Sequence, residues 1–122
     1  MLNAVQPGTY IQPHRHISPP KAESIVVLRG SIGFVIFEDD GRVREHFVAS
    51  TGSDPFGIDL QPGVYHTFVA LQQDTVLFEV KPGPYDGQTN KDFALWAPIE
   101  GSEEARDFLQ ELTGSFSDRT PW

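Results

Sequence analysis

Short runs of β-forming residues, each ended by a turn, recur at spacings of roughly ten residues through most of the chain. The runs that we predict as strands span residues 8–16, 23–28, 31–38, 43–49, 64–71 and 75–80. Turn-forming residues separate them, and Asp40-Gly41 is the sharpest hairpin signal because this pair tolerates the positive φ of a tight turn. Many short strands in this arrangement predict a sandwich, a jelly roll or a small barrel.

The last part of the chain has a helical period instead. From Ser102 onward the apolar residues fall on one helical face, namely Ala105, Phe108, Leu109 and Leu112. Ser102 can cap the start of this helix, and Gly114 suits its end. We therefore expect a β-barrel with a closing arm in residues 1–99, followed by a helix and an acidic tail in residues 100–122.

Composition limits the partners and the chemistry. The chain has 122 residues, enough for one compact domain. Its 17 acidic and nine basic residues give a net charge of −8, so we expect neither nucleic acid nor a membrane as a partner. We also expect no signal peptide and a cytoplasmic location. Because cysteine is absent, a metal site would have to use histidine, carboxylate or backbone oxygen ligands.

Three of the four histidines occupy strand positions from which they can converge. His14 and His16 are two residues apart, so both side chains leave the same face of a strand. Glu23 shares a face with Ile25, where a carboxylate is costly unless it is paired or bound to a cation. His66 likewise opens an apolar run. These four groups could hold one divalent first-row ion with open positions; the alternative is that the histidines are surface residues or hydrogen-bonded core residues.

Strand alternation also predicts the surroundings of this group. Tyr10 and Gln12 have the parity of the two N-terminal histidines, so we expect them in the wall of a ligand pocket, with core packing as the alternative for Tyr10. Phe68 shares the face of His66 and is expected to point inward. Lys21 either anchors an anionic ligand or is solvated. Glu79 is expected outside the barrel or at its mouth, because the apolar residues on either side of it should take the inward face.

Residues 82–86 and 91–96 are dense in aromatic side chains without strand alternation. We expect them to form an ordered arm with Trp96 as its hydrophobic anchor. Such an arm could close the barrel, cover a pocket or contribute to a dimer interface. Together with the short segment before His14, it leads us to predict a homodimer.

Two segments resemble the sequence motifs of cupins. The first motif is matched by Gly8-x5-His14-x-His16-x6-Glu23-x6-Gly30, and the second by Pro62-Gly63-x2-His66. Further strings, including Pro-His-Arg-His, Val-Leu-Arg-Gly and Phe-Glu-Val-Lys-Pro-Gly-Pro-Tyr-Asp, resemble the WbuC-type cupins. The resemblance covers residues 5–99.

This resemblance implies an all-β fold, the cupin double-stranded β-helix, which is a small jelly-roll barrel with a metal inside; the short C-terminal α-helix would follow it. The ligands of one divalent transition metal ion, namely zinc, iron, nickel or manganese, would be His14, His16, Glu23 and His66. The expected function is that of a metal-dependent enzyme on a small polar molecule such as a sugar derivative, of isomerase or epimerase type or of dioxygenase type. Two alternatives stay open: a non-catalytic metal-containing module that binds a small molecule, and a structural β-domain without metal.

Overall fold

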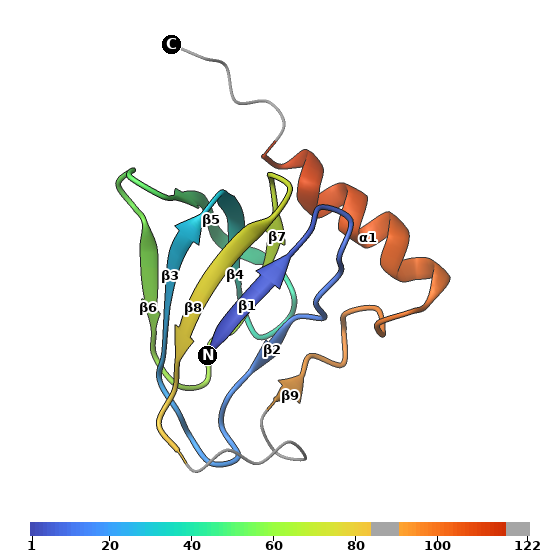
Figure 1. Cartoon of the computed structure of the whole chain (residues 1–122). Helices are drawn as coiled ribbons and strands as arrows, with labels where there is room; N and C mark the ends of the chain where they lie inside the picture. The colour runs from blue at the N-terminus through green and yellow to red at the C-terminus, as the bar shows by residue number, and fades with distance from the viewer. Residues whose placement is uncertain (84–90, 117–122) are drawn as a thin grey trace.

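A computed structural model describes residues 1–83 and 91–116 of the chain. Within them, two antiparallel sheets form a jelly-roll barrel, and one helix follows (Figure 1). The four-stranded sheet has the order β1 (Leu2–Val5), β8 (Thr75–Val80), β3 (Glu23–Arg29), β6 (Gly57–Leu60). The five-stranded sheet has the order β5 (Val43–Ser50), β4 (Ser31–Phe37), β7 (Tyr65–Ala70), β2 (His14–Arg15), β9 (Asp92–Phe93). The predicted fold class, a mostly-β jelly roll with a C-terminal helix, is confirmed.

Strand β4 is buried on both faces, which explains its continuous apolar sequence. Phe34 and Ile36 belong to the core inside the barrel, together with Leu77 of β8. Val35 and Phe37 point to the other side of the sheet and belong to a second apolar cluster. The barrel therefore has an inner core and an outer one on the five-stranded sheet.

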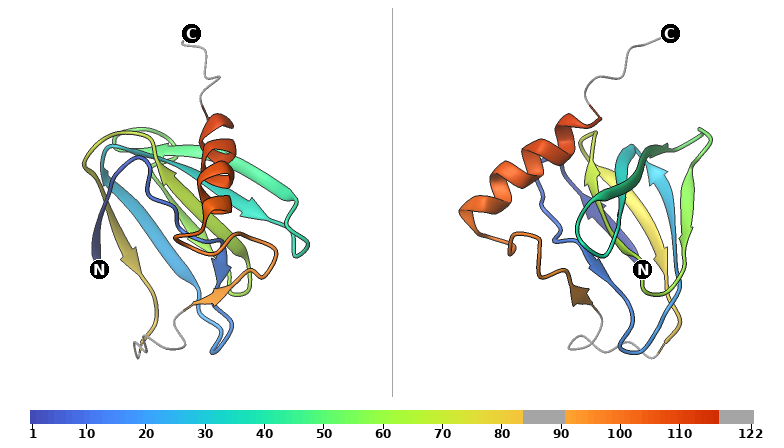
Figure 2. Two further views of the ribbon diagram at one scale, coloured as in Figure 1. Left: turned by 90° about the vertical axis from the view of Figure 1, so that its right-hand side faces the viewer. Right: turned by 180° about the vertical axis from the view of Figure 1, so that it is seen from behind.

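The helix α1 (Glu103–Gly114) covers this outer core. Ser102 caps it as expected, because its hydroxyl accepts a hydrogen bond from the backbone N–H of Ala105 at 3.3 Å. Leu112 is buried against the sheet. Further views show the helix outside the barrel throughout its length (Figure 2). The helix ends at Gly114, where the stop was expected; Gly114 is its last helical residue, and Ser115 is its C-cap in a right-handed conformation.

The predicted strands at 23–28, 31–38, 43–49, 64–71 and 75–80 correspond to β3, β4, β5, β7 and β8. The hairpin at Asp40-Gly41 is also present, with Gly41 at φ 98° between β4 and β5. The predicted strand at 8–16 is wrong over most of its length, because only His14–Arg15 pairs with neighbouring strands. The prediction missed the short strands β1, β6 and β9.

The predicted closing arm is described in part, since residues 84–90 lie outside the described residues. Strand β9 extends the five-stranded sheet by pairing with β2. Trp96 then packs its ring against Phe37 and Tyr65, with centroid distances of 4.9 and 5.7 Å. Trp96 thus anchors this segment on the outer face of the sheet.

Among the described residues, no helix has the length and apolar character required to cross a bilayer. A cytoplasmic location remains a prediction from the sequence.

Candidate metal centre and cavity

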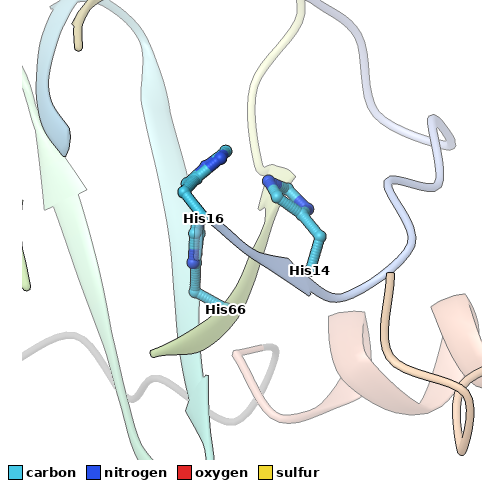
Figure 3. Close-up of side chains that lie close together, drawn as sticks. All are labelled: His14, His16 and His66. Carbon is cyan, nitrogen blue, oxygen red and sulfur yellow. The ribbon is translucent and has the colours of Figure 1, made fainter. Parts of the chain in front are cut away.

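Three histidine side chains meet inside the barrel (Figure 3). His14 on β2 is paired in register with His66 on the neighbouring strand β7, and His16 follows directly after β2. One ring nitrogen from each of the three lies within 4.8 Å of the other two. The predicted convergence of two separate sequence motifs is therefore present in the structure.

Hydrogen bonds to the backbone fix the tautomers of two of these rings. Nδ1 of His14 donates to the carbonyl oxygen of Gln12 at 2.9 Å, and Nδ1 of His66 donates to that of Val64 at the same distance. A carbonyl oxygen can only accept, so each Nδ1 carries the proton of the neutral ring. The lone pair is left on Nε2, which is the tautomer that a histidine needs in order to bind a metal through Nε2.

Burial keeps the rings of His14 and His66 neutral. The three histidines are all buried, and the ring of His66 stacks on Phe34 at a centroid distance of 5.7 Å. Burial, followed by the charge of His66, lowers the pKa of His14 to about 3. Burial also lowers the pKa of His66. Neutral imidazoles can bind a cation at ordinary pH without first losing a proton.

Glu23, the fourth predicted ligand, reaches two of the three histidines from the opposite sheet. Its Oε2 atom lies 2.6 Å from Nε2 of His16 and 4.0 Å from Nε2 of His66. Burial raises the pKa of Glu23, but the interactions with His16 and His66 outweigh burial and lower it to about 2. Glu23 is therefore a buried carboxylate, although the compact group of three ring nitrogens does not include it.

The donor set fits a divalent transition metal ion. Two rings present Nε2 lone pairs whose direction the backbone has already set. The Oε2 atom of Glu23 is buried and accepts no aligned hydrogen bond from the described residues, despite its short distance to His16. A bound cation would satisfy this oxygen, and imidazole with carboxylate is a ligand set that zinc, iron, nickel and manganese accept.

A cavity of about 660 Å³ opens onto this group. His14, Glu23 and His66 contribute to its wall, together with Phe68, which points inward as predicted. A volume of this size is in the range of sites for small organic molecules. The cavity thus places a ligand-sized space beside the candidate metal ligands.

Glu79 also lines this cavity, so of its two expected positions, outside the barrel or at its mouth, the position outside is wrong. On β8 the inward side is taken by Thr75, Leu77 and Glu79, whereas Phe78 is 42% exposed on the other side. The spacing from Leu77 could have indicated this position, because residues two apart on a strand point to the same side. Burial, together with the charge of Glu23, raises the pKa of Glu79 to about 7.

The structure does not bring Tyr10 and Gln12 to the cavity wall that it describes. The hydroxyl of Tyr10 donates to the carbonyl oxygen of Pro98 at 2.8 Å, and its ring packs on Phe108 of the helix. The side chain of Gln12 donates to the carbonyl oxygen of Ala94 at 3.2 Å. Both residues therefore hold the segment after β9 by hydrogen bonds. They do not face the cavity because residues 6–13 form no strand, so strand alternation does not apply to them.

Lys21 is buried and lines the cavity, so the solvated alternative for this residue is wrong. Lys81 and Lys91 line the cavity as well, and sequence reasoning missed both. Arg15 lies on the other face of β2, as alternation predicts, with its guanidinium 4.4 Å from the ring centre of Tyr65. The cationic residues at the site are therefore lysines.

Residues 1–49 match a family model described as a domain of unknown function, DUF6016. No curated protein matches the sequence.

Solved structures give a clear likeness in fold. ChmJ, a 3′-monoepimerase from Streptomyces bikiniensis in complex with dTDP-quinovose, is 18% identical with a TM-score of 0.61, over 73% of this chain and 48% of that chain. NovW, a 4-keto-6-deoxy sugar epimerase from Streptomyces spheroides, is 18% identical with a TM-score of 0.60, over 95% of this chain and 67% of that chain. Oxalate decarboxylase from Bacillus subtilis, described with Mn(II) centres, is 20% identical with a TM-score of 0.59, over 77% of this chain and 23% of that chain.

The matched part of this chain spans about half the length of ChmJ and about a quarter of that of oxalate decarboxylase. At these identities the likeness concerns the fold. The chain therefore has the cupin jelly-roll fold that these sugar epimerases and oxalate decarboxylase share.

Proposed function

We propose that this chain is a WbuC-type cupin metalloenzyme that moves a proton on a small polar molecule, in an isomerisation or epimerisation. One observation carries the proposal. Two buried histidines, His14 and His66, have their Nε2 lone pairs set by backbone hydrogen bonds and line a cavity of about 660 Å³. The sequence strings that resemble WbuC-type cupins support the finer family assignment.

The metal site of this proposal uses His14, His16 and His66 as nitrogen ligands and Glu23 as an oxygen ligand. When bound, a divalent ion supplies a Lewis acid that polarises a carbonyl or hydroxyl oxygen of the substrate. The Mn(II) centres of oxalate decarboxylase, which shares the fold, support a transition metal in such a barrel. The ion itself would be zinc, iron, nickel or manganese.

Glu79 is the group that favours proton transfer over oxygen chemistry. Its carboxyl group is partly buried in the cavity wall and interacts with Glu23 from the neighbouring strand. A carboxylate there can take a proton from a carbon next to a carbonyl and return it to the same carbon or its neighbour. This sequence balances without a co-reactant. The epimerase activities in the descriptions of ChmJ and NovW support the same reaction class.

The test is proton exchange in heavy water. Protein loaded separately with zinc, manganese, nickel and Fe(II) is incubated with a panel of keto sugars, aldoses and hydroxy acids, and deuterium incorporation is followed by NMR. We expect metal-dependent incorporation at a carbon next to a carbonyl. Oxygen consumption matched to substrate loss would replace this proposal with a dioxygenase, and ligand-dependent thermal stabilisation without turnover would replace it with a non-catalytic binding module.

We also propose that the protein is a homodimer whose interface is the outer face of the four-stranded sheet. The helix covers the five-stranded sheet, whereas the four-stranded sheet exposes large apolar side chains. Leu2 and Phe78 are paired in register and are 65% and 42% exposed, and Leu28 on β3 is 49% exposed. A second copy of this chain would bury this apolar surface.

A further inference from the structure

The cavity beside the candidate metal centre contains every lysine of the chain. The sequence has three lysines, Lys21, Lys81 and Lys91, and all three line this cavity. The six arginines do not contribute to the wall that the structure describes. In a chain with a net charge of −8, this concentration of lysine at one site points to a local role for positive charge.

Strand alternation places two of these lysines at the mouth of the barrel. Lys21 is two residues before Glu23 and shares its inward parity, and the loop between His16 and Lys21 folds back so that Lys21 N–H donates to the carbonyl oxygen of His16 at 3.1 Å. Lys81 is two residues after Glu79 and continues the inward side of β8. The pairing of β3 with β8 ends at Ser24 and Val80, so Lys21, before the start of β3, and Lys81, after the end of β8, lie at the same end of the sheet.

Lys91 reaches the same cavity from a different part of the chain. It immediately precedes β9, whose Phe93 is paired with His14 on β2. The positive charge of Lys91 acts on His14, and that of Lys81 acts on His66. After burial, each of these charges contributes to lowering the pKa of its histidine. The lysines are therefore within electrostatic range of the candidate metal ligands.

Few other charged groups of the described residues face the three lysines. Two carboxyl groups, Glu23 and Glu79, line the cavity, and Lys81 and Lys91 act electrostatically on Glu79. Met1 lines the cavity as well, and its terminal ammonium donates to the carbonyl oxygen of Glu79 at 2.8 Å. Glu23 is committed to the metal site in the function proposed above. The distant acidic surface repels anions only weakly in physiological salt, since the Debye length is about 8 Å, so the lysines inside the cavity decide which ligand charge is favoured.

We propose that this cavity takes a small organic anion, with its carboxylate or phosphate group bound by Lys21, Lys81 and Lys91 and a carbonyl or hydroxyl oxygen facing His14 and His66. This substrate class rests on the function proposed above for the position of the metal. The ammonium groups of lysine bind such anions as mobile point charges and fit either carboxylate or phosphate. The anionic group fixes one end of the molecule while the reacting end lies at the histidines.

The test compares charged molecules with neutral partners of the same shape. Isothermal titration calorimetry on metal-loaded protein uses D-galacturonate against D-galactose for a carboxylate, and glycerol phosphate against glycerol for a phosphate. The variants are Lys81→Gln and Lys91→Gln, whose side chains are less buried than that of Lys21. Arg106→Gln on the exposed side of the helix removes the same charge far from the cavity and is the matched control. Metal content is measured for every sample.

We expect at least one anion to bind about tenfold or more tightly than its neutral partner, and each lysine variant to lose roughly three- to tenfold in affinity for it with unchanged metal content. Lys81→Arg should retain most of the affinity, and Arg106→Gln all of it. The proposal is overturned if neither anion binds, if anion and neutral partner bind equally, or if Arg106→Gln is as damaging as the lysine variants. Wild-type protein that takes up no metal would instead defeat the proposed metalloenzyme.

Discussion

His14 and His66 face each other across the pairing of β2 and β7, with ring centroids 4.6 Å apart and with the same backbone hydrogen bond on each ring. Each Nδ1 donates to the carbonyl oxygen two residues earlier in the chain, so each Nε2 keeps a lone pair. Two sequence motifs separated by some fifty residues thus set the tautomer of their histidines by the same local hydrogen bond to the backbone. The candidate ligands are oriented by the backbone itself, which limits the reorganisation that metal binding would require.

Replacement of Glu79 by glutamine should remove proton transfer and leave metal binding in place. The amide keeps the size of the side chain but cannot accept and return the proton, so we expect a loss of about 10²- to 10⁴-fold in the rate of deuterium exchange. Glu45→Gln on the exposed part of β5 is the matched control. Exchange in Glu79→Gln at the wild-type rate would show that another group moves the proton.

Tyr10 gives a pH-dependent prediction that is independent of the metal site. Burial and then the charge of Glu100 raise the pKa of Tyr10 to about 12. An unfolded tyrosine has a pKa of about 10, so the folded state holds this proton more tightly. The resulting stabilisation is fully present below pH of about 10 and is lost as the pH rises toward 12.

Urea unfolding of Tyr10→Phe should therefore show a weaker loss of stability between these pH values than unfolding of the wild type. In a pH titration of the folded protein followed by phenolate absorbance, the increase that Tyr10 contributes near pH of about 12 should be missing from this variant. Superimposable pH curves for the two proteins would mean that burial and the charge of Glu100 do not raise the pKa of Tyr10 in solution.

Gly30 and Gly52 form a matched pair for testing the junction of β3 and β4. Both have positive φ, 82° and 74°, so alanine should cost about 1 kcal/mol at either position from backbone conformation alone. At Gly30 a Cβ atom would also overlap Oγ1 of the buried Thr75, whereas at Gly52 it would meet no atom within 4 Å. We expect Gly30→Ala to lose about 1 to 3 kcal/mol more than Gly52→Ala in denaturant unfolding. Equal losses would contradict this packing of β8 against the junction.

The proposed dimer interface can be tested by adding one charge to it. Leu28 is exposed on the outer face of β3, so Leu28→Lys should produce monomers where the wild type is a dimer. Light scattering coupled to size exclusion at micromolar concentration gives the mass directly. Asp39→Asn in the exposed turn after β4 makes the same change of +1 in net charge and should leave the mass unchanged. A monomeric wild type would contradict the proposal.

The strands with a clear pattern of apolar residues could be predicted from the sequence. The missed strands are short, and only their pairing with other strands in the fold defines them. Strand β4 was found because it is apolar on both faces, and β7 because His66 leads an apolar run. Strand β9 has two residues, and only its pairing with His14 and Arg15 makes it a strand. Nothing local to such a short segment distinguishes it from a loop.

Errors at the site have two physical causes. Glu79 was expected outside the barrel or at its mouth because Phe78 and Val80 are more apolar than it is, yet those two side chains lie on the uncovered outer face of the sheet. The alternation of side chains in a strand does not extend to Tyr10 and Gln12, because residues 6–13, between β1 and β2, form no strand. The histidines were found because strand geometry does hold from His14 to His16.

The central claim, one divalent metal ion on the three histidines, is tested most directly by elemental analysis of protein purified without chelators. We expect close to one equivalent of a transition metal in the wild type and in His46→Ala, whose side chain is exposed away from the cluster. His14→Ala and His66→Ala should retain less than about a tenth of that amount, with folding checked by circular dichroism. Equal metal content in the wild type, His14→Ala and His66→Ala would contradict the account.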